Sequence, residues 1–161
     1  MPDKNAHRYI MTRASLLLSS LMLSSVSTIA GPDKHYLDIE HNILPNENDL
    51  DITSIGMLSL KGDIVSSIKL SYLESGIDGK GSTLDFGGGY AFNSDVSLYV
   101  LLGVSLGYNW DRDDYIAAYF PEVGIVADFT KTFGMTVSGK RYFNLYEKDE
   151  NIVMLGLVFR K

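Results

Sequence analysis

A strict alternation of side chains runs from Val96 to Trp110. Its even positions are all large and apolar, and its odd positions are mostly small or polar. A period of two indicates a β-strand with two different faces. This run of about fifteen residues is much longer than the usual strand of about five or six. At about 3.4 Å per residue, such a strand is long enough to cross a membrane obliquely.

The first 30 residues have the pattern of a secretory signal peptide. Arg13 precedes a short apolar run from Leu16 to Leu23, and Thr28-Ile29-Ala30 supplies a small-residue cleavage site. A buried core helix is the alternative interpretation, but the run is too short and too rich in serine for a spanning helix. We therefore expect a signal peptide over residues 1–30, with Met1 or Met11 as its start, and a mature domain over residues 31–161.

Composition excludes several classes of protein. The chain has no cysteine, which rules out a disulfide framework and a lipid-modified cysteine. Its net charge of −6 disfavours nucleic-acid binding, which needs clustered Lys and Arg. Beyond the signal region, no apolar run approaches the about 18 residues of a transmembrane helix. Near-neutral hydropathy spread over alternating residues is typical of a transmembrane β-barrel.

Strand-like segments fill the rest of the chain. We predict eight of them, at Tyr36–Asn42, Leu50–Lys61, Ile64–Leu73, Ser82–Phe92, Val96–Tyr108, Tyr115–Thr130, Thr132–Leu145 and Asn151–Arg160. The connections between them alternate long and short, which is the asymmetry of an outer-membrane barrel with tight periplasmic turns. The sequence therefore predicts an all-β fold, an eight-stranded antiparallel up-and-down transmembrane β-barrel.

The alternation assigns each residue to a face. In the fifth segment the predicted lipid-facing residues are Leu98, Val100, Leu102, Val104 and Leu106. Elsewhere the same face takes Ile68, Leu70, Tyr72, Leu84, Phe86, Tyr90, Phe92, Val123, Ile125, Ala127, Phe129, Phe133, Met135, Val137, Phe143 and Leu145. The lumen face takes Ser67, Lys69, Ser71, Asp85, Gly87, Gly89, Ala91, Glu122, Gly124, Val126, Asp128, Thr136, Ser138, Lys140, Tyr142 and Asn144.

Three positions need special treatment. In the second segment Leu50, Ile52, Leu58 and Leu60 alternate, but Ser54 and Gly56 interrupt their face, so we expect a bulge there. Pro121 cannot donate to a sheet, which predicts a bulge in the sixth segment. Arg141 falls on the lipid side and must lie near an interface, because an Arg at mid-membrane costs about 2–4 kcal/mol.

A soluble periplasmic barrel binding an apolar ligand would show the same alternation with the faces inverted. Two observations favour lipid outside. The polar face is rich in Gly, Ser and Thr, and aromatic residues collect near strand ends as in an interfacial girdle, although scattered aromatics also occur in soluble β-proteins. The girdle candidates are Tyr36, Tyr72, Phe92, Tyr108, Trp110, Tyr115, Phe129, Phe133, Phe143 and Tyr146.

Charged residues on the lumen face form the main candidate site. They are Asp38, Glu40, Lys69, Asp85, Glu122, Asp128 and Lys140. Charges inside such a narrow barrel must be paired or hydrated. Two interpretations follow. The first, which we favour, is a salt-bridged polar plug that closes the tube. The second is a narrow path for ions or protons.

Catalytic and metal-binding motifs are missing. Only His35 and His41 follow the signal region, and neither lies on a late strand beside a Ser and a carboxylate. No spacing predicts a zinc site, and Asp111, Asp113 and Asp114 lack the remaining ligands of a calcium loop. Gly87-Gly88-Gly89 lies within a strand, where it permits curvature or close packing by a lumen side chain. We expect no enzyme activity and no cofactor.

The last segment ends on Phe159, and it resembles the C-terminal strand that the outer-membrane assembly machinery reads, although Arg160 and Lys161 follow it. The motifs Ser97–Tyr108, Pro121–Gly124 and Ser138–Phe143 resemble the YfaZ family of small outer-membrane barrels of enteric bacteria. The resemblance covers mainly the C-terminal half, and it implies a porin-like barrel without an established substrate. We expect a structural, surface-interaction or porin-like protein of a Gram-negative outer membrane, with lipid and lipopolysaccharide as its partners.

Overall fold

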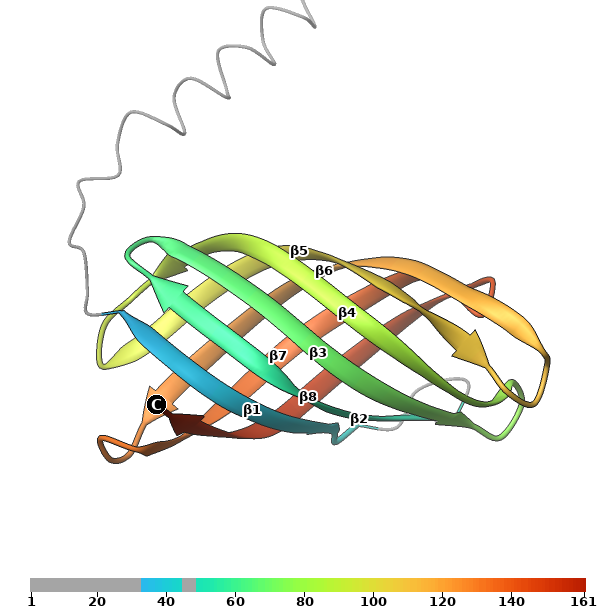
Figure 1. The fold of residues 1–161 in the computed structure, drawn as a ribbon, viewed down its shortest axis with the longest axis horizontal. Helices are drawn as coiled ribbons and strands as arrows, with labels where there is room; N and C mark the ends of the chain where they lie inside the picture. Colours follow the sequence, from blue (N-terminus) through green and yellow to red (C-terminus); the bar gives the residue numbers. More distant parts are fainter. Residues whose placement is uncertain (1–32, 45–48) are drawn as a thin grey trace, which may run out of the picture.

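The chain forms a closed antiparallel barrel. The computed structural model describes residues 33–44 and 49–161, so the expected signal peptide lies outside the described residues. The strands are β1 (Lys34–Asn42), β2 (Leu50–Lys61), β3 (Ile64–Ser75), β4 (Gly79–Phe92), β5 (Val96–Asn109), β6 (Asp114–Asp128), β7 (Phe133–Leu145) and β8 (Lys148–Arg160). Each strand pairs with the next, and β1 pairs with β8, as Figure 1 shows. The predicted eight-stranded up-and-down barrel is confirmed. No helix in the described part is long and apolar enough to cross a membrane.

The connections differ from the prediction. We call the end with the β1–β2, β3–β4, β5–β6 and β7–β8 connections the loop end, and the opposite end the turn end. β3, β4 and β8 extend further toward the loop end than predicted, so the β3–β4 connection shrinks to residues 76–78 and the β7–β8 connection to residues 146–147. Gly79 adopts a φ of 81°, which lets β4 begin directly after a tight turn. The predicted alternation of long and short connections is wrong beyond the first loop.

The predicted parity of β3 to β6 is correct. On β5, Leu98, Val100, Leu102, Val104 and Leu106 project outward and are 47–64% exposed, whereas Ser97, Tyr99, Leu101 and Ser105 are buried inside. A Cβ on Gly87 would lie only 2.8 Å from Cδ1 of Leu101. The glycine run therefore accommodates a lumen side chain, as predicted. The barrel is therefore apolar on its outside.

β2 carries its alternating apolar residues on the inside of the barrel. Leu50, Ile52, Leu58 and Leu60 all point inward and are at most 3% exposed. The register of β2 runs without a shift against both β1 and β3, so the bulge expected near Ser54 and Gly56 is absent. These four apolar side chains belong to the interior, and the outward apolar residues of β2 are Ile55 and Met57.

A bulge does occur, but in β7. The register against β8 shifts between Tyr142 and Leu145, which turns Leu145 inward and Asn144 outward, so both predictions for these residues are wrong. Asn144 has a φ of 64°, a left-handed conformation that Asn tolerates better than most residues. Pro121 makes no bulge. The register between β6 and β7 is the same before it, where Tyr119 pairs with Phe143, and after it, where Glu122 pairs with Lys140.

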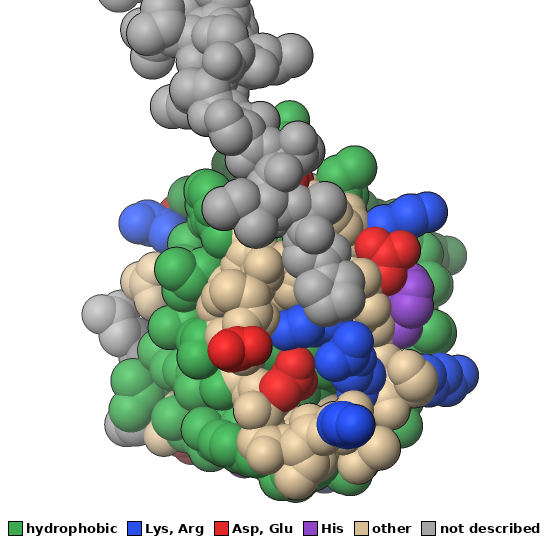
Figure 2. Space-filling model, turned by 90° about the vertical axis from the view of Figure 1, so that its left-hand side faces the viewer, with side chains coloured by type: hydrophobic (Ala, Val, Ile, Leu, Met, Phe, Trp, Pro, Cys, Tyr) green, Lys and Arg blue, Asp and Glu red, His purple; other side chains and the backbone are tan. Residues whose placement is uncertain are grey.

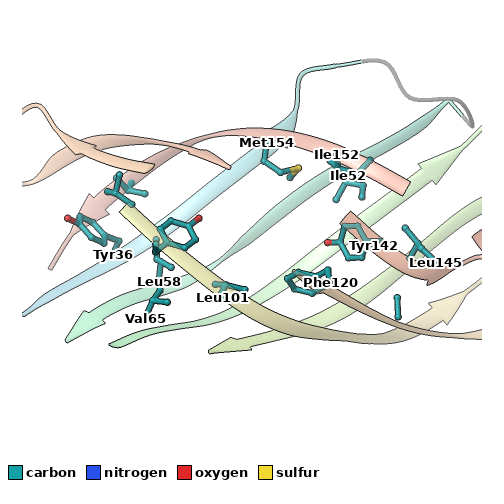
Figure 3. Close-up of a cluster of buried hydrophobic side chains, with 14 of the residues drawn as sticks. Tyr36, Ile52, Leu58, Val65, Leu101, Phe120, Tyr142, Leu145, Ile152 and Met154 are labelled. Atoms are coloured by element: carbon teal, nitrogen blue, oxygen red, sulfur yellow. The ribbon is translucent and has the colours of Figure 1, made fainter. Parts of the chain in front are cut away.

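Two apolar layers line the interior at different heights. Near the turn end, the layer includes Tyr36, Leu58, Leu60, Val65, Leu101, Val126 and Val158. Near the loop end, it includes Leu50, Ile52, Leu73, Ile116, Leu145 and Ile152. Figure 3 shows Tyr36 and Leu58 at the end where β1 begins, and Ile52 and Leu145 well along the barrel toward the other end. Polar side chains occupy the level between the two layers, together with Phe120, Tyr142 and Met154.

Aromatic side chains form outward pairs near both ends. At the loop end, Tyr72 pairs with Trp110, Tyr108 with Tyr115 and Tyr119 with Phe143. At the turn end, Phe133 lies between Phe129 and Phe159. Two of the girdle predictions are wrong, because Tyr36 is buried in the lumen and Tyr146 packs against the core. The remaining candidates lie on the outside.

Gly124 makes room for a large lumen side chain, which provides a test of the packing. A Cβ at this position would lie 2.3 Å from Cζ of Tyr99. We predict that Gly124→Ala displaces the Tyr99 ring and destabilises the barrel by about 1–3 kcal/mol, the usual cost of overpacking. Urea unfolding in detergent micelles measures this difference. Gly88→Ala is the matched control, because nothing lies within 4 Å of its Cβ position; equal effects of the two substitutions would contradict the packing described.

Candidate functional site

Two lysines hold the centre of the lumen. Lys69 of β3 lies 2.6 Å from Asp38 and 2.8 Å from Glu40, both on β1. Lys140 of β7 lies 2.5 Å from Glu40 and 3.5 Å from Glu122 of β6. All five side chains are at most 2% exposed. Glu40 therefore bridges the two lysines, and the ion pairs link β3, β1, β7 and β6 across the barrel.

Tyr99 extends this chain to β5. Its hydroxyl donates a hydrogen bond of 2.6 Å to Glu122. The ring lies against Gly124, whose missing side chain leaves the space it occupies. The cluster has three carboxylates, Asp38, Glu40 and Glu122, and two lysines, so this hydroxyl supplies a donor to an acidic group in excess. A buried charge needs such a donor to offset its lost hydration.

Asp85 is held by hydroxyl groups and by no lysine. It accepts hydrogen bonds from Ser71 at 2.7 Å, Thr83 at 2.9 Å and Ser105 at 2.5 Å. Tyr142 is a further donor at 3.5 Å, and Ser71 also bonds to Ser54 of β2 at 2.8 Å. The prediction that the lumen charges form ion pairs therefore needs correction at Asp85. We call these residues and the ion-paired cluster together the polar plug, to which every strand from β1 to β7 contributes.

Asp128 lies outside the polar plug. It is at the turn end, where Lys34 forms an ion pair with it at 3.0 Å and the Tyr36 hydroxyl donates to both of its oxygens. Lys34 also donates a hydrogen bond to the carbonyl of Ser94. Figure 2 shows this end of the molecule, with charged side chains on the end face and hydrophobic ones around the flanks. The charged residues that we predicted as one cluster therefore form two clusters, the polar plug and the Asp128 pair, and the apolar layer of the turn end separates them.

Several members of these clusters were missed by sequence reasoning. Lys34 precedes the predicted start of the first strand, yet it is buried. Tyr99 and Tyr142 fall on lumen positions of the predicted pattern, but the alternation does not indicate which charged group they contact. The lumen-side position of these two tyrosines was the signal that could have placed them in the clusters. A tyrosine on the polar face of a narrow barrel must direct its hydroxyl to a hydrogen-bond partner.

The two histidines of the described chain lie on the outer wall. His35 contacts the Ser59 hydroxyl, and His41 contacts Thr53 at 2.9 Å and Asp51 at 3.5 Å. Both contacts of His41 involve Nδ1, so the ring does not bridge a hydroxyl to a carboxylate as a catalytic histidine does. Across residues 33–44 and 49–161, no three His, Cys, Asp or Glu side chains are placed to hold a metal ion. Asp111 instead accepts a hydrogen bond from the Lys80 backbone.

A pocket of about 240 Å³ opens at the loop end, between the β5–β6 and β7–β8 connections. Arg112 and Tyr146 line it. Arg112 forms an ion pair with the buried carboxylate of Asp78 at 2.7 Å, which ties two connections together. Burial, with a contribution from Asp78, raises the pKa of Tyr146 to about 12. The pocket lining is mostly polar, and its one basic side chain, Arg112, is paired with Asp78, which lies outside the lining.

Comparison with known proteins gives the fold and no family. No protein-family model matches the chain, and no curated protein matches it in sequence. The N-terminal β-barrel domain of Pseudomonas aeruginosa OprF superposes with a TM-score of 0.61 at 20% identity, over 80% of this chain and 97% of that one. A de novo designed transmembrane β-barrel superposes with a TM-score of 0.59 at 14% identity, over 81% and 98% of the two chains. The chain thus has the fold of transmembrane β-barrels.

Lys140 tests the polar plug. Lys140→Met leaves Glu40 and Glu122 buried without their shared cation, and we predict a loss of about 3–5 kcal/mol in the free energy of unfolding. Chemical unfolding in detergent micelles measures it. Lys80→Met is the matched control, since Lys80 forms an exposed pair with Glu74 and its removal has little effect. If Lys140→Met fails to fold, adding Glu40→Gln should restore folding; a fully stable Lys140→Met variant would contradict the role of the polar plug.

Proposed function

We propose that this chain is an integral β-barrel of a Gram-negative outer membrane, with a structural or surface-interaction role and no catalysis. The single observation that carries the proposal is the inverted polarity of the barrel. Leu98, Val100 and Leu102 are exposed on the outside, whereas Lys69 and Lys140 are buried at the centre. A soluble barrel with this surface would expose a large apolar belt to water, and such patches mark contact with lipid or protein.

The interior argues against the alternative of a soluble barrel that carries an apolar ligand. That function needs an apolar cavity inside the barrel. Here a chain of ion pairs, which begins at Lys69 and ends at Glu122, crosses the middle of the lumen. An apolar layer lies on either side of this chain. An eight-stranded barrel has just enough internal width for such side chains. The same packing favours a closed tube over a porin-like pore.

Further parts of the proposal rest on the sequence. The N-terminal pattern supports export, and the terminal aromatic of β8, Phe159, supports recognition by the barrel-assembly machinery. Phe159 lies on the outer wall beside Phe133, where it is partly exposed. Membership of the YfaZ family rests on the C-terminal motifs, and lipid and lipopolysaccharide are the partners that fit an apolar wall between two aromatic belts.

Carbonate washing of envelopes tests membrane integration. We expect the full chain, expressed in a Gram-negative host, to stay with the membrane pellet and to migrate faster in gels before heating than after. Its strands close a hydrogen-bonded barrel that detergent does not open. A soluble periplasmic protein provides the control for release. Recovery of the folded chain in the carbonate wash would contradict the proposal.

Paired arginine substitutions sharpen this test. Leu102→Arg places a charge at the centre of β5 and should cost about 2–4 kcal/mol when the barrel is folded in vesicles, whereas Val96→Arg at the strand end should cost about 0–1 kcal/mol. Both residues are exposed on the same face of one strand, so a soluble barrel would tolerate both alike. Equal unfolding free energies for the two variants would contradict lipid contact.

Planar-bilayer recording tests whether the tube is closed. We predict no steady single-channel current from the full chain, because the ion pairs of Lys69 and Lys140 and the two apolar layers fill the lumen. An open porin inserted under the same conditions serves as the positive control. Uniform current steps from this chain would assign it to the porin-like alternative.

A further inference from the structure

The outer wall has a groove where β6, β7 and β8 run side by side. Its volume is about 480 Å³, and its lining is mostly apolar, with Pro121, Val123 and Val153 among the lining residues. Gly139 lies between the two valines, because it pairs with Val123 on one side and with Val153 on the other. The groove therefore lies within the apolar wall. Glu122 and Lys140 of the polar plug also belong to its lining, but their side chains are at most 2% exposed and face the lumen.

A missing side chain creates this hollow. Gly139 faces outward, and nothing lies within 4 Å of the position that its Cβ would take. Pro121 has no N–H to donate, and the ladder between β6 and β7 has no bridge between Tyr119↔Phe143 and Glu122↔Lys140. The wall is thus indented over three strands, with the indentation running toward Arg141.

Arg141 stands at the loop-end side of the groove and is about half exposed. It follows Gly139 on the same face of β7, and its guanidinium lies over the Phe143 ring at 4.9 Å. Every other outward-facing basic residue of the described strands is within two residues of a strand end: Lys61, Lys80, Lys148 and Arg160. Arg141 is therefore the one basic group set into the apolar wall of these strands.

The guanidinium retains binding capacity. Its one ion pair, to Asp149, is 3.4 Å long and exposed, and such pairs contribute little. A guanidinium carries five N–H donors in a planar fork that matches phosphate oxygens. The apolar hollow and its cationic end together are complementary to a lipid that has a hydrocarbon chain at one end and an anionic phosphate at the other.

We propose that this groove holds an acyl chain of an anionic phospholipid whose phosphate contacts Arg141. This inference rests on the proposed function, since the outer wall must lie in a bilayer. Apolar contact alone would not select one lipid, because all lipid tails are equally apolar. Selection arises from the fit of a chain between Val123 and Val153 and from the charge of Arg141.

Native mass spectrometry of the full chain in detergent tests the site. Dioleoyl phosphatidylglycerol and dioleoyl phosphatidylcholine are added at equal concentration, and we expect the wild-type chain to retain phosphatidylglycerol preferentially. Gly139→Leu fills the hollow and should lose most of the retained lipid. Gly88→Leu is the matched control, because Gly88 also faces outward into open space, and it should retain lipid as the wild type does. Arg141→Gln should keep lipid binding and lose the preference between headgroups.

Each other result counts against the site. Equal retention by the Gly139→Leu and Gly88→Leu variants, or no headgroup preference in the wild type, would overturn it. Binding of inorganic phosphate to a protein that retains no lipid would show that Arg141 binds phosphate without an acyl chain in the groove, which also overturns it. Heat-dependent gel migration establishes that every variant is folded. A chain that is folded and soluble without detergent would instead refute the proposed function, so the two failures are distinguishable.

Discussion

The ion-paired chain from Lys69 through Glu40 and Lys140 to Glu122 is the constraint on which the rest of the barrel depends. Burying these charges is costly unless each has a partner, and removing one partner costs more than the pair contributes. The strands must therefore close in the one register that brings β1, β3, β6 and β7 together at the same height. The apolar side chains that remain divide into two interior layers and an outer wall, which explains why apolar residues occur on both faces of this chain.

Much of this arrangement could be predicted from the sequence where the alternation is regular. On β5, large apolar residues occupy every even position and small or polar ones most odd positions, so the pattern defined the strand and its two faces. The charged residues of the polar plug on β1, β3, β4, β6 and β7 fall on lumen positions for the same reason. A period of two reports the pleat of a strand directly, and no tertiary information is needed to apply it.

The rest depended on which strands meet, and this is not encoded in local periodicity. Leu58 and Leu60 are apolar because they belong to an interior layer, and the sequence does not distinguish such residues from a lipid-facing set. The bulge in β7 reverses the parity after Tyr142, so a residue as apolar as Leu145 points inward. Glu40 and Lys140 are 100 residues apart, and their contact follows from the stagger of the closed barrel. The groove beside Gly139 likewise results from three neighbouring strands.

The central claim is that the apolar face of β5 lies in lipid, and spin labels test it most directly. The chain contains no cysteine, so single-cysteine variants at Val96, Leu98, Val100, Leu102, Val104 and Leu106 can each carry one label. In reconstituted vesicles, we predict that collision with oxygen is highest at the centre of this series and that collision with a water-soluble nickel complex is lowest there. High accessibility to the nickel complex at Val100 and Leu102, or an immobilised spectrum that indicates burial in a protein interior, would contradict the account.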